Sequence, residues 1–161
     1  MITQTDIVNY CINDSNFDTS LITDEMILNA QERHFKPLVG EELYSQIVLD
    51  EATYSGLING DTYTYCGYTY QFRGIKPMLV WFALGNSLPF IHEQIRNLGV
   101  RIGSDETSTA GNLEQMKTYC YQMARSYING MNDYINRKSA SVSIYDNSIQ
   151  LKTKIIGDII L

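Results

Sequence analysis

The sequence predicts a mainly α protein: a small helical bundle with an inserted β-hairpin and an extended C-terminal arm. Apolar residues recur at three-to-four spacing over most of residues 1–138, which is the period of amphipathic helices. Residues 61–73 alternate instead, as the strands of a hairpin do. Over residues 139–161 the alternation of apolar and polar residues becomes irregular, and the sequence ends with apolar residues. We therefore expect a helical domain over 1–138 and a β-prone arm over 139–161.

Three helices are predicted in the first 51 residues. Thr3 or Thr5 can cap a first helix that runs to about Ile12. A second helix begins after Thr23 and is expected to end at Pro37, because proline disfavours the helical conformation in the residue before it. The third helix covers 41–51. Its predicted inward positions are Leu43, Tyr44, Ile47 and Val48.

A hairpin is predicted next, where aromatic and β-branched residues alternate on both sides of Cys66-Gly67. A two-residue loop there places all four tyrosines of the segment on one face, because side chains alternate along strands. Those tyrosines are Tyr63, Tyr65, Tyr68 and Tyr70. A longer loop would shift the register, and Cys66 is not a residue that favours the positive φ of such a turn.

Two long helices follow the hairpin. Pro77 suits the first turn of a helix that is apolar nearly all round, which marks it as central to the core. Pro89 is expected to kink or restart it. After a loop rich in Gly, Ser and Asp over 98–109, a single helix is predicted from about Asn112 to Lys138. Its apolar stripe is Met116, Tyr119, Cys120, Met123, Tyr127, Met131 and Tyr134. The predicted core comprises Leu28, Leu43, Tyr44, Ile47, Leu79, Trp81, Phe82 and Met123.

The composition fits one soluble globular domain, since 161 residues with 44% hydrophobic and 19% charged residues can bury a single core. The net charge of −6 argues against a nucleic-acid-binding surface over the whole protein, because phosphate contacts need clustered Lys and Arg. A local basic patch around Arg96 and Arg101 stays open. The N-terminal residues lack the pattern of a secretory signal, and the longest apolar run is far shorter than a membrane span, so we expect neither.

Catalytic and metal-binding motifs are missing from the sequence. His34 and His92 are the only histidines, and neither has metal-ligand spacing. The three cysteines are odd in number and widely spaced, which predicts reduced thiols. A nucleophile pair of Cys66 or Cys11 with either histidine has no support from spacing. We therefore predict no enzymatic activity, no cofactor and no metal.

Two segments carry a resemblance to a known family. Residues 27–44 contain A-Q, then P-L-V-G-E-E-L-Y, and residues 74–91 contain K-P-M-L-V-W, then P-F. Over about residues 3–137 the chain resembles small virion proteins of phages that infect Bacteroidetes, including the ring or connector proteins between portal and tail in crAss-like phages. The resemblance implies a structural virion protein, a ring-forming head-to-tail connector (head-completion or adaptor protein).

The same resemblance implies the partners and the location. The partners would be copies of the chain in a ring, the portal protein, and adjacent connector or tail proteins. DNA would pass through the lumen without sequence-specific binding. The protein would be found at the head-tail junction of the virion, and in the host cytoplasm during assembly.

Candidate interface residues are found in the hairpin and in the arm. They are Tyr63, Tyr65, Tyr68, Tyr70, Ile155, Ile156, Ile159, Ile160 and Leu161. Tyrosine is enriched in interface hot spots, and the apolar tail needs burial, for which strand addition to a partner is one route. Two alternatives stay open. The tyrosines could pack on the chain's own helices, or the protein could be a soluble binding module or small enzyme with the hairpin as ligand site, including a carbohydrate-stacking face.

Overall fold

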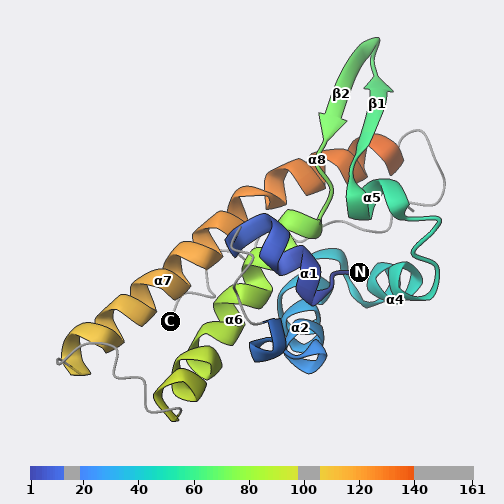
Figure 1. Cartoon of the computed structure of the whole chain (residues 1–161). Helices are drawn as coiled ribbons and strands as arrows, with labels where there is room; N and C mark the ends of the chain where they lie inside the picture. Colours follow the sequence, from blue (N-terminus) through green and yellow to red (C-terminus); the bar gives the residue numbers. More distant parts are fainter. Residues whose placement is uncertain (13–18, 98–105, 140–161) are drawn as a thin grey trace.

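The computed structural model describes residues 1–12, 19–97 and 106–139. These residues form helices and one two-stranded antiparallel hairpin, so the predicted mainly α fold with an inserted hairpin is confirmed (Figure 1). None of the helices in these ranges combines the length and apolar character needed to cross a membrane. The expected arm beyond Ser139 and the basic pair Arg96 and Arg101 lie outside the residues whose side chains are described.

Threonine caps start the first two helices, as predicted. Thr3 and Asp6 form a reciprocal capping box at α1 (Gln4–Ile7), which continues as a π-helical turn, η1 (Val8–Ile12). A short 3₁₀ helix, η2 (Thr19–Leu21), precedes α2 (Asp24–Ala30). The Thr23 side chain accepts a hydrogen bond from the Met26 backbone N–H at the start of α2.

The expectation that Pro37 ends the second helix is wrong. After α2 the chain continues through a π-helical turn, η3 (Gln31–Phe35), into α3 (Lys36–Val39). The Lys36 N–H donates to the carbonyl of Gln31, five residues back, so the hydrogen-bond pattern changes just before the proline. Pro37 then occupies the first turn of α3. Backbone N–H groups in a first turn have no partner within the helix, so the missing N–H of proline costs no hydrogen bond there. The helix ends at Gly40 instead.

The middle of the chain supplies α4 (Glu41–Leu49), α5 (Ser55–Asn59), β1 (Asp61–Tyr65), β2 (Tyr68–Phe72) and α6 (Lys76–Asn97). Helix α4 buries three of its four predicted inward residues, but the prediction for Val48 is wrong, because its side chain is 48% exposed. Helix α5 was not predicted, because its five residues are too few to show a period. Helix α6 runs through Pro89 without a restart.

The last two helices replace the single helix that the sequence predicts. They are α7 (Glu106–Ser126) and α8 (Ile128–Ser139), which meet at Tyr127. At Gly85 of α6, an added Cβ would lie 3.1 Å from Cβ of Cys120, so α6 and α7 approach closely there. The small residues of α7 therefore face α6, while Met116 and Tyr119 are more than half exposed. The buried face is Cys120, Ala124, Ile128, Met131, Tyr134 and Ile135.

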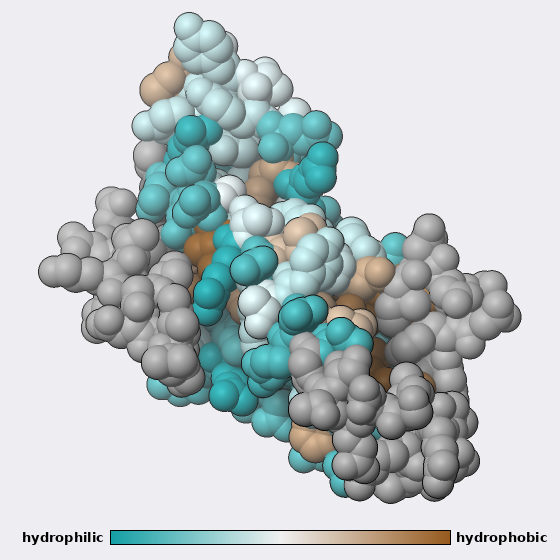
Figure 2. Space-filling model, turned by 90° about the vertical axis from the view of Figure 1, so that its left-hand side faces the viewer, coloured by the Kyte–Doolittle hydropathy of each residue, from teal (hydrophilic) through white to brown (hydrophobic). Residues whose placement is uncertain are grey.

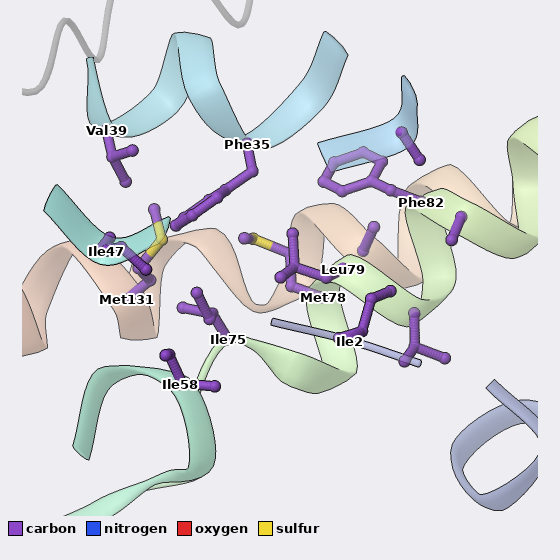
Figure 3. Packing of buried hydrophobic residues seen from close by; sticks show 14 of the residues in the cluster. Ile2, Phe35, Val39, Ile47, Ile58, Ile75, Met78, Leu79, Phe82 and Met131 are labelled. Atoms are coloured by element: carbon purple, nitrogen blue, oxygen red, sulfur yellow. The ribbon is translucent and has the colours of Figure 1, made fainter. Parts of the chain in front are cut away.

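The hydrophobic core lies where α6 meets α2, η3 and α8 (Figure 3). Figure 3 shows Phe35 of η3, Met78 and Leu79 of α6 and Met131 of α8 gathered in one cluster with Ile75, which directly precedes α6. The buried residues that were predicted correctly are Leu43, Tyr44, Ile47, Leu79 and Phe82.

Three residues of the predicted core are not fully buried. Leu28 is 50% exposed. Trp81 and Met123 are half-buried at the edge of the core, where the Trp81 ring packs edge-on against Tyr119. Because α6 is apolar on several sides, its sequence pattern does not tell which of its large residues lies at the rim.

Replacing Leu79 with Ala should lower the free energy of unfolding by about 2–5 kcal/mol, because a fully buried side chain leaves a cavity. The matched control is Leu49→Ala on α4, where the leucine is 86% exposed and the expected change is below about 0.5 kcal/mol. Urea unfolding followed by circular dichroism measures both. Equal losses in the two variants would contradict this description of the core.

Candidate functional site

The hairpin is closed by the two-residue turn that the sequence predicts. Its central pairs are Tyr63 with Tyr70, Thr64 with Thr69 and Tyr65 with Tyr68. In the turn, Cys66 has φ = 49° and Gly67 has φ = 81°, and a type I′ turn requires positive φ at both positions. The predicted register is confirmed, with a non-glycine residue in the left-handed region at Cys66.

The two faces of the hairpin differ in chemistry and in burial. We use the name tyrosine face for Tyr63, Tyr65, Tyr68 and Tyr70, which share one side of the ladder. The opposite side carries Thr62, Thr64, Thr69 and Gln71, all exposed. Figure 2 shows the hairpin as a projection above the helices, in the pale colours of intermediate hydropathy.

Two glycines fix where the hairpin leaves the bundle. Gly60 and Gly74 precede and follow the strands, and both have positive φ. An added Cβ at Gly60 would lie 2.7 Å from the Phe72 carbonyl oxygen, and one at Gly74 only 2.5 Å from the carbonyl oxygen of Ile58. The backbone segments at the hairpin base therefore pack so closely that no side chain fits between them.

A carboxylate at the base ties the hairpin to α8. Oδ2 of Asp61 accepts a hydrogen bond from the Tyr134 hydroxyl at 3.0 Å and lies 2.8 Å from Nζ of Lys138. The bond with Lys138, followed by that with Tyr134, holds the pKa of Asp61 below its usual value. The Tyr134 ring also stacks on Phe72, with centroids 4.4 Å apart, and meets Tyr63 edge-on.

Arg137 of α8 lies over the middle of the tyrosine face. Its guanidinium carbon is 4.1 Å from the ring centroid of Tyr70 and 5.8 Å from that of Tyr65, which is cation–π geometry. Its Nη1 is 3.5 Å from the Tyr63 hydroxyl. Tyr63 and Tyr70 stack on each other across the strands, at 5.6 Å. One arginine thus contacts three of the four tyrosines.

Exposure divides the tyrosine face into two halves. Tyr63 and Tyr70 are partly buried against α8, while Tyr65 is 37% and Tyr68 is 70% exposed. For the inner pair, packing on the chain's own helix accounts for the aromatic rings. The outer pair presents its rings to solvent near the tip, and a contact there with a partner stays a prediction.

The other candidate interface residues are at the C-terminus. Ile155, Ile156, Ile159, Ile160 and Leu161 lie outside the described residues.

Sequence reasoning missed the residues that hold the tyrosine face in place. These residues are Asp61 of β1 and Tyr134, Arg137 and Lys138 of α8. The contacts between the hairpin and α8 join residues that are more than 70 positions apart in the chain. A single sequence carries no signal for such a pairing. The only hint is local: two cations close the last turn of α8, where the helix dipole favours positive charge.

A groove of about 570 Å³ opens beside the base of the hairpin. It is on the threonine side, since Thr62 and Gln71 line it together with the rings of Tyr10, Phe72 and Tyr127. Its aromatic and polar lining is the kind that a small polar ligand could stack on, and its volume is within the usual range of ligand sites.

The histidine and cysteine side chains do not form an obvious reactive centre. The ring of His34 stacks on Phe82 at 4.5 Å, and its Nε2 is 3.2 Å from Oδ1 of Asn86, which also accepts from the Tyr121 hydroxyl. Burial lowers the pKa of His34 and raises that of Cys11 to about 12. Cys11 is therefore a protonated thiol at neutral pH, which is a poor nucleophile. In the described ranges, no cluster of His, Cys, Asp or Glu could hold a metal ion.

Replacing Asp61 with Asn should loosen the hairpin without unfolding the core, because it removes the ionised partner of Lys138 and keeps the side-chain size. The loss of stability should be below about 1 kcal/mol, as this pair is partly exposed to solvent. Hydrogen exchange measured by NMR should accelerate in β1 and β2 and stay unchanged in α6.

The pH dependence provides the check on this prediction. Because the folded-state pKa of Asp61 is lowered, its contribution is present above the unfolded carboxyl pKa of about 3.9 and is lost as the pH falls through the folded-state value. The difference between wild type and variant should shrink in that acidic range. Glu114→Gln, which alters an exposed pair on α7, is the control and should leave the hairpin unchanged. Equal protection of the strands in wild type and Asp61→Asn would contradict the anchoring role.

A model of a family of unknown function, DUF6712, matches residues 35–155 of the 161. No curated protein and no solved structure matches the chain. The matched range begins at Phe35 of η3 and contains the whole hairpin, α6, α7 and α8, hence every described residue of the tyrosine face and its supports. The chain therefore belongs to the DUF6712 family.

Proposed function

We propose that this chain is a structural virion protein: a ring-forming head-to-tail connector, of the head-completion or adaptor kind, between the portal and the tail of a tailed phage. The observation that carries the proposal is the outer half of the tyrosine face. Tyr65 and Tyr68 project from the bundle on a hairpin whose inner half is fixed to α8 by Arg137 and Asp61. Exposed aromatic rings on a preorganised support are typical of interface hot spots.

The resemblance to connector proteins is the second support. Its two segments, 27–44 and 74–91, form α2, η3, α3 and the start of α4, and most of α6. These elements pack against each other and contribute Phe35, Val39, Met78 and Leu79 to the core. The resemblance thus rests on residues that build the scaffold, as is expected when related proteins share a fold and an assembly role rather than a reaction.

In this proposal the partners are other copies of the chain in a ring, the portal protein, and the next connector or tail protein. The location is the head-tail junction of the virion, after assembly in the host cytoplasm. The net charge of −6 suits a ring through which DNA passes without being held, because like charges repel.

Changing Tyr65 and Tyr68 together to Ser should leave the fold intact and weaken assembly at least tenfold, because two aromatic anchors are lost. Sedimentation velocity of the protein, alone and mixed with the portal protein of its phage, measures the effect. The matched control is Thr64→Ser with Thr69→Ser, on the opposite face at the same height of the ladder, and should assemble normally. Normal assembly by the tyrosine variant would overturn the role of this face.

Removing residues 139–161 should give a folded helical protein that no longer joins its assembly. The removed segment is almost entirely outside the described residues, and in this proposal its apolar end is buried on a partner. Circular dichroism and sedimentation measure fold and assembly separately. Aggregation of the shortened chain would contradict the arm hypothesis, because it would mean that the segment covers the protein's own core.

One observation favours a second function, a soluble binding module. The groove lined by Tyr10, Thr62, Gln71 and Tyr127 could hold a small polar ligand such as a sugar. The sedimentation experiment separates the two functions, since a binding module would remain monomeric in the presence of portal.

A further inference from the structure

The outer edge of β2 has backbone groups that the hairpin itself does not use. Tyr65 and Tyr68 flank the two-residue turn and exchange both hydrogen bonds of their pair, and bonded and non-bonded pairs alternate from there. The N–H and C=O groups of Thr69 and Gln71 therefore point away from β1. Within the described ranges the sheet has two strands, and these outward groups make no hydrogen bond. An extended segment can add as a strand at an edge of this kind.

The groove beside the hairpin base lies along the same edge. Gln71 of β2 and Arg73, just after the strand, line it together with the rings of Tyr10 and Tyr127. Figure 1 shows β2 on the side of the hairpin nearer to α1 and α7, and the two tyrosines lie in η1 and between α7 and α8. Tyr10 is 48% exposed, so part of its ring is open to a further contact. Edge and groove together offer backbone hydrogen bonds and aromatic surface to an extended segment.

Residues 149–155 have the sequence pattern of a strand that such an edge would accept. They read I-Q-L-K-T-K-I, so Ile149, Leu151 and Ile155 share one face of a strand and the polar residues share the other. The segment lies outside the described residues. The DUF6712 match continues past the end of α8 and stops at Ile155, so it includes the whole pattern. The pattern therefore belongs to the part of the chain that the family shares, and residues 156–161 lie beyond it.

The chain is long enough to bring this segment to its own groove. Tyr127, which lines the groove, directly precedes α8, whose 12 residues span about 18 Å. Residues 140–148, between α8 and the segment, can span up to about 30 Å when extended. A tethered segment has an effective concentration on the order of millimolar, which favours it over the same segment of another copy.

We propose that residues 149–155 dock on their own hairpin as a third strand, paired with the outer edge of β2. The apolar face of this strand, with Leu151 at its centre, covers the rings of Tyr10 and Tyr127 in the groove, while its lysines face solvent. A two-stranded hairpin is only marginally stable in water, and the third strand pairs the edge that it leaves open. The docking does not depend on the proposed function, because it holds whether or not the protein forms a ring.

The docked strand divides the candidate interface residues of the C-terminus into two groups. Ile155 packs on the protein's own groove, while Ile156, Ile159, Ile160 and Leu161 follow the strand and remain for a partner. The arm then begins at the hairpin base rather than at the end of α8. This shortens the length of chain that must be ordered when a partner binds. The groove is filled by the chain itself, in place of a small ligand.

Amide hydrogen exchange measured by NMR tests the pairing directly. The N–H groups of Thr69 and Gln71 gain partners only when a third strand is added, whereas that of Tyr70 is bonded within the hairpin in either case. We expect the Thr69 and Gln71 amides of the full-length protein to exchange at least tenfold more slowly than those of a chain that ends at residue 148. A chain that ends at Ile155 should keep the full-length protection. The measurements are made at a concentration where sedimentation velocity finds a monomer.

A matched pair of substitutions in the full-length chain tests which face of the strand is covered. Leu151→Ser should lower the protection of the Thr69 and Gln71 amides at least tenfold, because it removes the central apolar side chain from the groove. Lys152→Ser changes the next residue, on the opposite face, and should leave the protection unchanged. Circular dichroism checks that both variants keep their helices.

Several results would overturn the docking. These are fast exchange of Thr69 and Gln71 in the full-length protein, equal protection in the chain that ends at residue 148, and equal effects of Leu151→Ser and Lys152→Ser. Protection that grows with protein concentration would also overturn it, because the edge would then be paired by a segment of another copy. The ring is decided separately, by sedimentation with the portal protein, so failure of the docking and failure of the proposed function are distinguishable.

Discussion

The structure depends on the burial of helix α6 by its neighbours. Met78, Leu79, Val80 and Ala83 are fully buried, and α1, α2, η3 and α7 all pack on this helix. Each large apolar side chain removed from water contributes about 1.5–3 kcal/mol, so a helix that is covered on several sides supplies much of the stability of a chain this size. The short helices of the first 60 residues could not hold their shape alone and are stabilised by packing on α6.

Two polar residues of this apolar helix, Ser87 and Asn86, have hydrogen-bond partners. Ser87 donates to the Ala83 carbonyl of its own helix, at 2.8 Å. Asn86 receives the Tyr121 hydroxyl of α7 and meets His34 of η3. Because a buried polar group without a partner is costly, the Asn86 contacts with η3 and α7 favour one rotation of α6 relative to those two elements. The contact with Asn86 also gives His34 a structural role in packing η3 on α6.

Helix α8 connects the core to the proposed interaction surface within two turns. Met131 is buried in the core, Tyr134 links the core to the hairpin base, and Arg137 lies over the tyrosine rings. The direction of the hairpin is therefore set by a helix that is itself fixed by the core. A surface held in this way loses little conformational entropy on binding, which favours it as an assembly contact over a loop.

The sequence by itself determined the elements whose signals are local. The threonine caps, the hairpin register around Cys66-Gly67, the central position of α6 and the burial of Leu43 and Ile47 follow from capping chemistry, alternation and period. Only the tertiary structure decided the rest, because it depends on residues that are distant in the chain. Three examples are the π-helical turn before Pro37, the division of the last helix at Tyr127 and the exposure of Leu28. Each depends on packing partners that cannot be inferred from the local sequence pattern. The same holds for the site: the alternation placed four tyrosines on one face, but which half is covered was decided by Arg137, more than 60 residues away, through long-range packing on α8.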